Sequence, residues 1–228
     1  MDNISIISNN PNHNPNHNPN HNPNHNPNNN PNNNPNPQSN IKLDLNSILN
    51  RNNIAIKIKN ILSHFERNKH DYTIKRGIYI YGAPGIGKTQ FVMSLLKDLG
   101  YDVVKYDAGD MRNKSIIDTI SRHNMADKNI LSLMTKKVKS IAIVMDEIDG
   151  MNSGDKGGIN ALIKLIRQKK TQKQRLENVT LNPIICIGNY NMDKKIRELM
   201  KVCHTFELKA PTTNQIEVLL KQNISRQQ

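Results

Sequence analysis

The sequence predicts an α/β fold in which helices cover both faces of a parallel β-sheet. Short apolar runs typical of buried strands alternate along the chain with longer stretches whose apolar residues recur at helical intervals. A glycine-rich loop separates the first strand-like run from the helical stretch after it. Two carboxylates end a later apolar run, at the edge where open parallel sheets bind their ligands. These observations favour a ligand site at the carboxyl ends of the strands.

Residues 1–40 are predicted to form a disordered, low-complexity tail rich in Asn, Pro and His. The tetrapeptide Asn-Pro-Asn-His recurs and places four histidines four residues apart, at His13, His17, His21 and His25. Proline at every fourth position prevents regular helix or sheet hydrogen bonding, and asparagine favours turns. A histidine tract of this kind can also chelate metal ions. We favour the simpler interpretation, a tail left by repeat expansion.

Residues 41–210 are predicted to form the α/β domain. Apolar residues recur at helical intervals up to His64, which indicates one or two amphipathic helices. The later strands are short runs rich in Ile, Val and Tyr, whereas the later helices are longer and mix apolar with charged residues. In chain order we expect a strand at 77–81, a helix at about 88–99, a strand at 102–106, a polar helical stretch at about 113–135, a strand at 141–145, a helix at about 158–170, a strand at 184–187, a helix near 194–200, a strand at 205–208 and a helix at 213–220.

Charge and cysteine content narrow the functional class. The chain has 228 residues, with 32 Lys and Arg against 19 Asp and Glu, and a formal net charge of +13. Only Asp2 falls in the tail, so residues 41–228 hold 32 basic and 18 acidic side chains, a net charge of +14. This excess favours a polyanionic partner, nucleic acid before a membrane. Two cysteines exclude a disulfide framework, and the sequence has neither a long apolar run nor a signal-peptide pattern, so we expect an intracellular protein with no membrane partner.

The glycine-rich loop fits the phosphate-binding pattern G-x-x-x-x-G-K-[ST] in full. Its glycines let backbone N–H groups turn toward phosphate oxygens, and the next helix presents its positive end to the same anion. Lys88 is expected to reach the β- and γ-phosphates, and the Thr89 hydroxyl to bind Mg²⁺. The motif follows a predicted strand and opens a predicted helix, which distinguishes it from a chance glycine-rich turn. Its residues are Gly82, Ala83, Pro84, Gly85, Ile86, Gly87, Lys88 and Thr89.

Two acidic residues follow the apolar run at 141–145. Asp146 is expected to hold Mg²⁺ through its water shell, and Glu147 to polarise a water for in-line attack on the γ-phosphate. The alternative is an acidic helix start after a strand. A Glu beside the Mg²⁺-binding Asp favours hydrolysis over phosphate transfer to a metabolite. The sequence has no Asn-Lys-x-Asp guanine motif, so ATP is favoured over GTP.

Asn189 follows another buried run and is expected to lie beside the carboxylates, where its amide could orient the attacking water. A Gly-Asn pair is also common in ordinary turns, so this signal is weaker than the first two. Cys186, within the same run, is expected to be a small core residue.

The phosphate-binding loop, the acidic strand end and the terminal Asn, in this order and spacing, resemble those of the AAA+ ATPases. The resemblance is closer to the large subunit of replication factor C, the eukaryotic-type sliding-clamp loader, and spans about 77–216. In that family Asn189 corresponds to the sensor-1 residue, and Lys88, Thr89, Asp146 and Glu147 have the roles given above. The further residues that carry the resemblance are Leu99-Gly100-Tyr101, Asp107 to Ser115, Met145 to Met151, Lys156 to Ile159, Pro183 to Cys186, Lys195-Ile196-Arg197 and Cys203.

The resemblance implies an ATPase subunit that works with other clamp-loader subunits to load a sliding clamp at primer–template DNA in DNA replication. Because a neighbouring subunit supplies an arginine finger, worth about 10³–10⁵ in rate, hydrolysis by the chain alone is expected to be slow. A nuclear, viral or cytoplasmic replication compartment is implied. Clamp loaders also turn one helix toward DNA, and the basic residues at the corresponding place are Lys164, Arg167, Lys169 and Lys170. A solvated lysine-rich face is an equally good interpretation of these residues.

Two departures from the family leave alternatives open. Val202 stands where small clamp-loader subunits have the Arg of a Ser-Arg-Cys motif, as in a large subunit that receives a finger without donating one. Residues 211–228 correspond only to the start of a helical lid, so we expect the lid to be truncated and no residue is assigned to adenine. The alternatives are a nucleotide-binding but non-catalytic fragment or interaction module, and another DNA-acting AAA+ ATPase.

Overall fold

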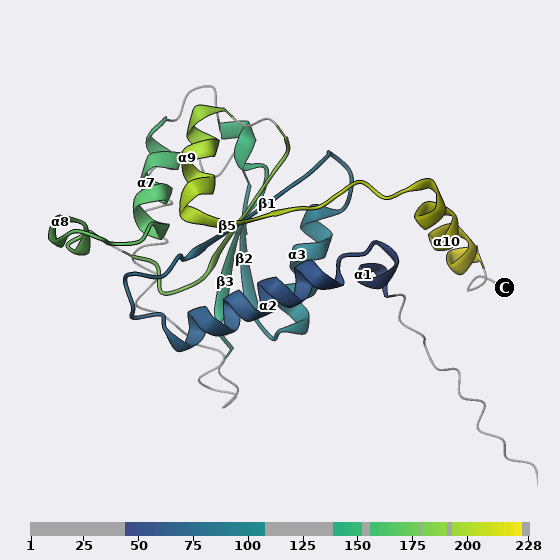
Figure 1. Ribbon diagram of the computed structural model, residues 1–228, viewed down its shortest axis with the longest axis horizontal. Helices are drawn as coiled ribbons and strands as arrows, with labels where there is room; N and C mark the ends of the chain where they lie inside the picture. The colour runs from purple at the N-terminus through teal and green to yellow at the C-terminus, as the bar shows by residue number, and fades with distance from the viewer. Residues whose placement is uncertain (1–43, 108–138, 152–155, 178, 191–192, 225–228) are drawn as a thin grey trace, which may run out of the picture. The chain divides into compact units, whose positions relative to one another are not determined.

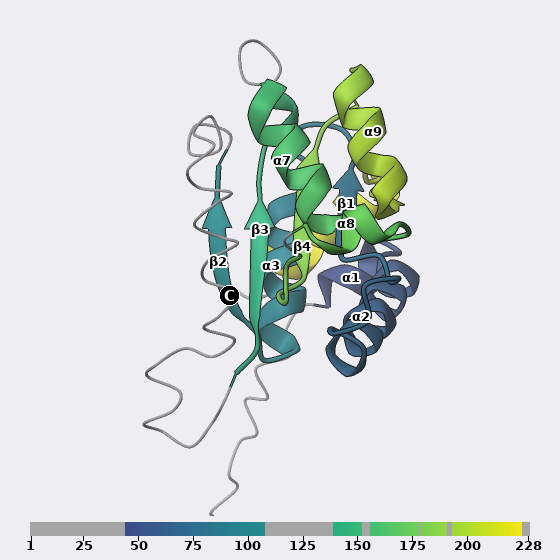
Figure 2. The same ribbon diagram turned by 90° about the vertical axis from the view of Figure 1, so that its left-hand side faces the viewer.

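Among the described residues, five strands form one parallel sheet in the order β2-β3-β4-β1-β5, and Figure 2 shows β2, β3, β4 and β1 side by side. The computed structural model describes residues 44–107, 139–151, 156–177, 179–190 and 193–224. Within the described residues, helices lie between β1 and β2, between β3 and β4 and between β4 and β5, which together with the parallel pairing confirms the predicted α/β class. The elements are α1 (Leu45–Ile48), α2 (Asn52–Arg67), β1 (Gly77–Tyr81), α3 (Lys88–Asp98), β2 (Asp102–Tyr106), β3 (Ile141–Met145), the 3₁₀ helix η1 (Ile148–Met151), α7 (Lys156–Ile166), α8 (Gln172–Arg175), β4 (Ile184–Gly188), α9 (Lys194–Val202), β5 (Cys203–Glu207) and α10 (Thr213–Ile224).

Helices cover both faces of this sheet, α2 and α3 on one side and α7 and α9 on the other (Figures 1 and 2). Successive side chains of a strand point to opposite faces, so each central strand serves two cores. On β1, Ile78 and Ile80 join the core under α2 and α3, and Tyr79 joins the core under α7 and α9. Burial on both faces explains why β1, β3 and β4 are continuous apolar runs rather than alternating ones.

The predicted strands at 77–81, 102–106 and 141–145 are confirmed with the same bounds. β5 begins two residues earlier than predicted, because its backbone is already in register with β1 at the pair Gly77 and Cys203. Both cysteines are free and buried, which confirms the prediction that Cys186 is a core residue. The predicted tail at 1–40 and the predicted helical stretch at 113–135 lie outside the described residues.

The predicted helix at 158–170 differs most from the structure. α7 ends at Ile166, and the chain continues into the short helix α8. The backbone N–H of Lys169 donates to Tyr72 O at 2.8 Å, in the loop before β1, and this long-range contact replaces the next helical hydrogen bond. Thr171 then caps α8 by accepting a hydrogen bond from Gln174 N.

α10 is the last described helix and contacts α1, where Gln215 Nε2 donates to Ile48 O at 2.8 Å. Four of its apolar side chains are at least two-fifths exposed: Ile216, Val218, Leu220 and Ile224. No helix in the described part of the chain combines the length and apolar character needed to cross a bilayer.

Candidate functional site

The candidate site lies at the carboxyl edge of the sheet, where β3, β4 and β1 are neighbours. Because all three strands are parallel, the segments that follow them leave the sheet at the same edge. These segments contain the phosphate-binding loop after β1, the acidic pair after β3 and Asn189 after β4. The topology therefore brings together residues that are far apart in the sequence.

The phosphate-binding loop depends on glycine at two kinds of position. Gly85 and Gly87 have φ values of 75° and 81°, in the left-handed region that side chains other than glycine rarely adopt. A Cβ atom at Gly82 would collide with the backbone oxygen of Leu208, so the loop and the end of β5 can pack closely only with glycine there. α3 starts directly after Gly87, and its N-terminal N–H groups border the same loop.

Lys88 is held inside this loop by three oxygen acceptors. Its Nζ lies 3.1 Å from Gly82 O, 2.8 Å from Ala83 O and 2.8 Å from Asn189 Oδ1. Burial lowers the pKa of Lys88, while the charges of Asp149 and Asp146 act in the opposite direction. An ammonium group fixed beside glycine-rich backbone suits the phosphates of a nucleotide.

Thr89 and Asp146 bring together two side-chain oxygen atoms of the kind that bind magnesium. Thr89 Oγ1 donates to Asp146 Oδ2 at 2.9 Å, and the Asp146 side chain is only 10% exposed. Among the described residues, no group of three His, Cys, Asp or Glu side chains could form a metal cage. One hydroxyl ligand and one carboxylate that would hold the ion through its water shell, with phosphate and water as further ligands, suit Mg²⁺, so the residues fit the ion.

Glu147 adopts an unusual backbone conformation at the edge of this site. Its φ is 51°, in the left-handed region, and its N–H donates to Asp146 Oδ1 at 3.1 Å. Strain of this kind costs about 1–3 kcal/mol and is most often found at functional sites. The Glu147 side chain is exposed to solvent, so its carboxylate is accessible to water.

Asn189 is fixed at both ends of its amide. Oδ1 accepts from Lys88, and Nδ2 donates to Asp149 Oδ2 at 3.0 Å. Gly188 before it leaves room for Tyr79, because a Cβ there would collide with the Tyr79 hydroxyl. Asp149 lies in η1, three residues beyond Asp146, and sequence analysis missed it because an acid in a turn gives no distinctive pattern.

The family profile described as "ATPase family associated with various cellular activities (AAA)" matches residues 78–210, more than half of the chain. The chain belongs to the AAA family. It is 26% identical to replication factor C subunit 1 of Saccharomyces cerevisiae over 190 residues. It is 29% identical to the replication factor C large subunit of Methanococcus aeolicus over 178 residues, and 32% identical to human replication factor C subunit 1 over 155 residues.

These alignments cover most of the chain but a small part of each relative. They take in 76%, 78% and 65% of the chain, against 21% of the yeast protein, 33% of the archaeal protein and 12% of the human protein. The resemblance to the large subunit of replication factor C that the motifs predict is confirmed by these relatives. It concerns the AAA domain rather than the relatives' whole length.

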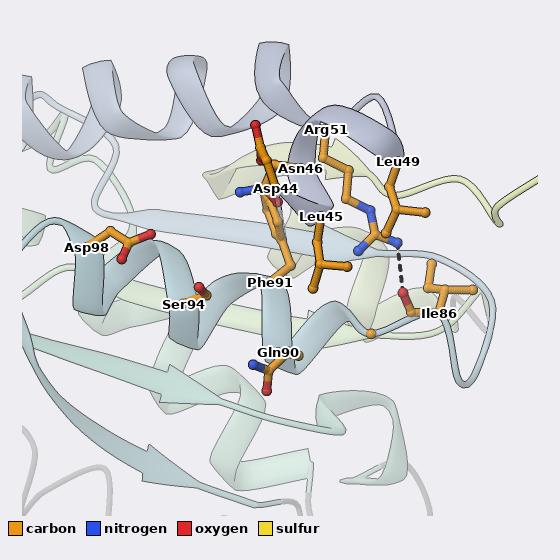
Figure 3. A pocket seen from close by; sticks show the side chains of 11 residues that line it. Asp44, Leu45, Asn46, Leu49, Arg51, Ile86, Gln90, Phe91, Ser94 and Asp98 are labelled. Atoms are coloured by element: carbon orange, nitrogen blue, oxygen red, sulfur yellow. Dashed lines mark hydrogen bonds between the residues drawn. The ribbon is translucent and has the colours of Figure 1, made fainter. Parts of the chain in front are cut away.

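The AAA domain also has a cavity of about 400 Å³ between α1 and α3, directly beside the phosphate-binding loop (Figure 3). Arg51 lines one side of the cavity. Its Nη2 donates to Ile86 O at 2.7 Å, and its guanidinium lies 5.9 Å from the centre of the Phe91 ring. Gly87 and Gln90 also line the cavity. Sequence analysis did not identify Arg51, because an isolated Arg before a helix gives no signal of its own.

The basic residues in the last turn of α7 and in the loop after it divide into two groups. Lys164 and Lys170 are exposed. Lys169 is fully buried, with Nζ 2.9 Å from Glu177 Oε2, and Arg167 Nη2 lies 2.6 Å from Glu177 Oε1. The prediction that Lys169 contacts nucleic acid is therefore wrong, because this side chain has no surface left for a partner. Arg167 is partly exposed, but its guanidinium forms an ion pair with Glu177.

Proposed function

We propose that the chain binds ATP with Mg²⁺ and hydrolyses it. The observation that carries this proposal is the convergence of Lys88, Thr89, Asp146 and Asn189, which follow three different strands, at one edge of the sheet. Membership of the AAA family supports the same assignment. Glu147, exposed and directly after Asp146, is the proposed general base for hydrolysis.

Each residue has a separate proposed task. Lys88 and the loop N–H groups hold the β- and γ-phosphates, and the Thr89 hydroxyl and Asp146 hold the ion. A bound Mg²⁺ would supply positive charge to offset that of the phosphates. Glu147 polarises the attacking water, and Asn189 orients that water or the γ-phosphate. Asp149 is a positioning residue, because it fixes the amide of Asn189.

We assign the base of the nucleotide to the cavity between α1 and α3. Gly87 and Gln90 line this cavity at the side that borders the phosphate-binding loop, so a nucleotide with its phosphates in the loop could extend into the cavity. Phe91 and Leu45 supply apolar surface for a planar ring. Arg51 ties the segment before α2 to the phosphate-binding loop by donating a hydrogen bond to Ile86 O. ATP rather than GTP is proposed because the sequence lacks the guanine motif.

At the level of the whole assembly, we propose a clamp-loader subunit that acts in DNA replication. The relatives named replication factor C subunit 1 and large subunit support this role. Other clamp-loader subunits, a sliding clamp and primer–template DNA are the proposed partners, in a nuclear, viral or cytoplasmic replication compartment. Lys164 and Lys170 remain proposed DNA contacts, because both are exposed.

Binding of a fluorescent ATP analogue with Mg²⁺ tests the first part of the proposal, with Lys88→Ala as the variant that should lose it. Turnover tests the second part, and it should rise when partner subunits and primer–template DNA are added. An assembled complex whose turnover ignores DNA would contradict the clamp-loader role. Absence of analogue binding to the wild-type chain, alone and with partner subunits, would contradict nucleotide binding itself.

A non-catalytic interaction module is the second candidate, favoured by the exposed apolar side chains of α10. This candidate predicts that the chain binds partner subunits, while their ATP turnover is unchanged by Glu147→Gln in this chain. The ATPase proposal predicts a loss of turnover in the same assay.

A further inference from the structure

Lys105 lies beside the carboxylate proposed to hold Mg²⁺, and no motif accounts for it. Its Nζ is 3.1 Å from Asp146 Oδ2 and also 3.1 Å from Asp107 Oδ1. The first of these oxygens is the same one that accepts the Thr89 hydroxyl at 2.9 Å. One carboxylate oxygen of the proposed metal site is therefore shared between an ammonium group and a hydroxyl.

The strand pairing holds Lys105 in this position. In the β2–β3 register, Lys105 is opposite Val144, and the pairing continues past the strand end because Asp146 N donates to Tyr106 O at 2.8 Å. The backbone of Lys105 is thus fixed next to β3. Its side chain is 39% exposed, so the ammonium group can change partners without leaving water.

Two cations compete for one carboxylate oxygen. An ammonium group and a divalent ion a few ångströms apart repel each other, so an ion held by Asp146 displaces Lys105 from that oxygen. Asp107 offers the displaced ammonium a second carboxylate at the same distance that it now has to Asp146. A lysine side chain at this exposure is protonated at neutral pH, so the competing group carries a full positive charge.

We infer that Lys105 is a positioning residue that competes with Mg²⁺ for Asp146 and so raises the Mg²⁺ concentration required for nucleotide binding. The inference rests on the proposed function, because it concerns the same site. It adds a property that the phosphate-binding loop and the acidic pair do not imply: the metal requirement of the site is set in part from β2.

Binding of the fluorescent ATP analogue to the full chain, measured over a series of free Mg²⁺ concentrations, tests the inference. In Lys105→Met the half-saturating Mg²⁺ concentration should fall about two- to fivefold, the range expected for loss of a partly exposed ion pair. Lys105→Gln should give the same shift, and it can replace Lys105→Met in the measurement if that variant does not fold. Lys105→Arg keeps the charge and should stay near the wild-type value.

Lys139→Met is the matched control. Lys139 forms an ion pair with Asp102 at 3.5 Å, at the opposite end of the same two strands, so the variant removes an equal charge away from Asp146. Its Mg²⁺ requirement should not change. An unchanged or higher requirement in Lys105→Met, or equal shifts in both Met variants, would overturn the inference. A wild-type chain that binds no analogue at any Mg²⁺ concentration would instead refute the proposed function.

Discussion

Lys88 and Asn189 are 101 residues apart in the sequence, and their side chains meet at 2.8 Å between Nζ and Oδ1. The contact joins the helix after β1 to the end of β4, two adjacent strands of the sheet. It couples the group proposed to bind phosphate to the group proposed to orient water. A change at either residue is therefore expected to affect the other.

Asn189→Ala should lower ATP turnover by about 100-fold and change analogue binding much less. The variant removes the acceptor for Lys88 and the donor to Asp149, so the reacting groups lose alignment, and misplacement of about 1 Å has an effect of this size. Single-turnover hydrolysis in the assembled complex measures it. Equal losses in binding and turnover would indicate a purely structural role.

Glu147→Gln should keep nucleotide binding and lose turnover by about 10²–10⁴-fold, the usual contribution of a positioned general base. The substitution keeps the side-chain size and leaves the Glu147 N–H bond to Asp146 in place, since that bond uses the backbone. Analogue binding and phosphate release, measured on the same preparation, separate the two effects. Turnover at the wild-type rate would remove Glu147 from the mechanism.

Lys88→Ala should weaken analogue binding by at least about tenfold, because hydrogen bonds to charged groups contribute about 1.5–3 kcal/mol. Its ammonium group is the one cation among the described loop residues 82–89. Lys97→Ala, in the last turn of the same helix, is the matched control and should bind normally. A Lys88→Ala chain that binds as tightly as wild type would place the phosphates elsewhere.

The central strands could be predicted from the sequence because burial on both faces makes them unbroken apolar runs. The meeting of Lys88, Thr89, Asp146 and Asn189 at one edge could also be predicted, because each follows such a run. Asp149 and Lys105 could not, since their importance comes from contacts between strands that leave no local pattern. Lys169 was assigned wrongly for the same reason: a basic run does not reveal which member is buried against a distant Glu177.

Glu177 links stability to pH. Hydrogen bonds and charge from Arg167 and Lys169 lower the pKa of Glu177 from 4.5 to about 2. Because the folded pKa is the lower one, this stabilisation is fully present above about pH 4.5 and is lost as pH falls toward 2. Urea unfolding of the wild-type chain should show a decline across that window, and Glu177→Gln should flatten it.

At neutral pH, Glu177→Gln should reduce the free energy of unfolding by about 1–3 kcal/mol, because Lys169 stays buried without its carboxylate. Glu198→Gln is the matched control, since Glu198 pairs with Lys195 in a partly exposed i,i+3 contact at 2.9 Å that involves no buried ammonium group, and its loss should change the free energy of unfolding much less. Similar losses of unfolding free energy in both variants would mean that the contact of Glu177 with buried Lys169 stabilises the fold no more than a partly exposed ion pair does.

Gly188 and Tyr79 form the last testable pair. A Cβ at position 188 would collide with the Tyr79 hydroxyl, and φ at Gly188 is outside the left-handed region, so the obstacle to alanine is steric rather than conformational. Gly188→Ala should therefore lower the free energy of unfolding by about 1–3 kcal/mol, the usual range for overpacking. Urea unfolding of the variant measures this cost.

Tyr79→Phe should relieve the collision. Within the described residues the Tyr79 hydroxyl has no hydrogen-bond partner, so the single substitution should cost less than about 1 kcal/mol. The double variant Gly188→Ala/Tyr79→Phe should then be more stable than Gly188→Ala alone, with a coupling free energy of about 0.5–3 kcal/mol. If the losses of unfolding free energy in the two single variants simply add, the Tyr79 hydroxyl is not the reason why position 188 requires glycine. Close packing of Tyr79 against the end of β4 would then not explain the glycine before Asn189.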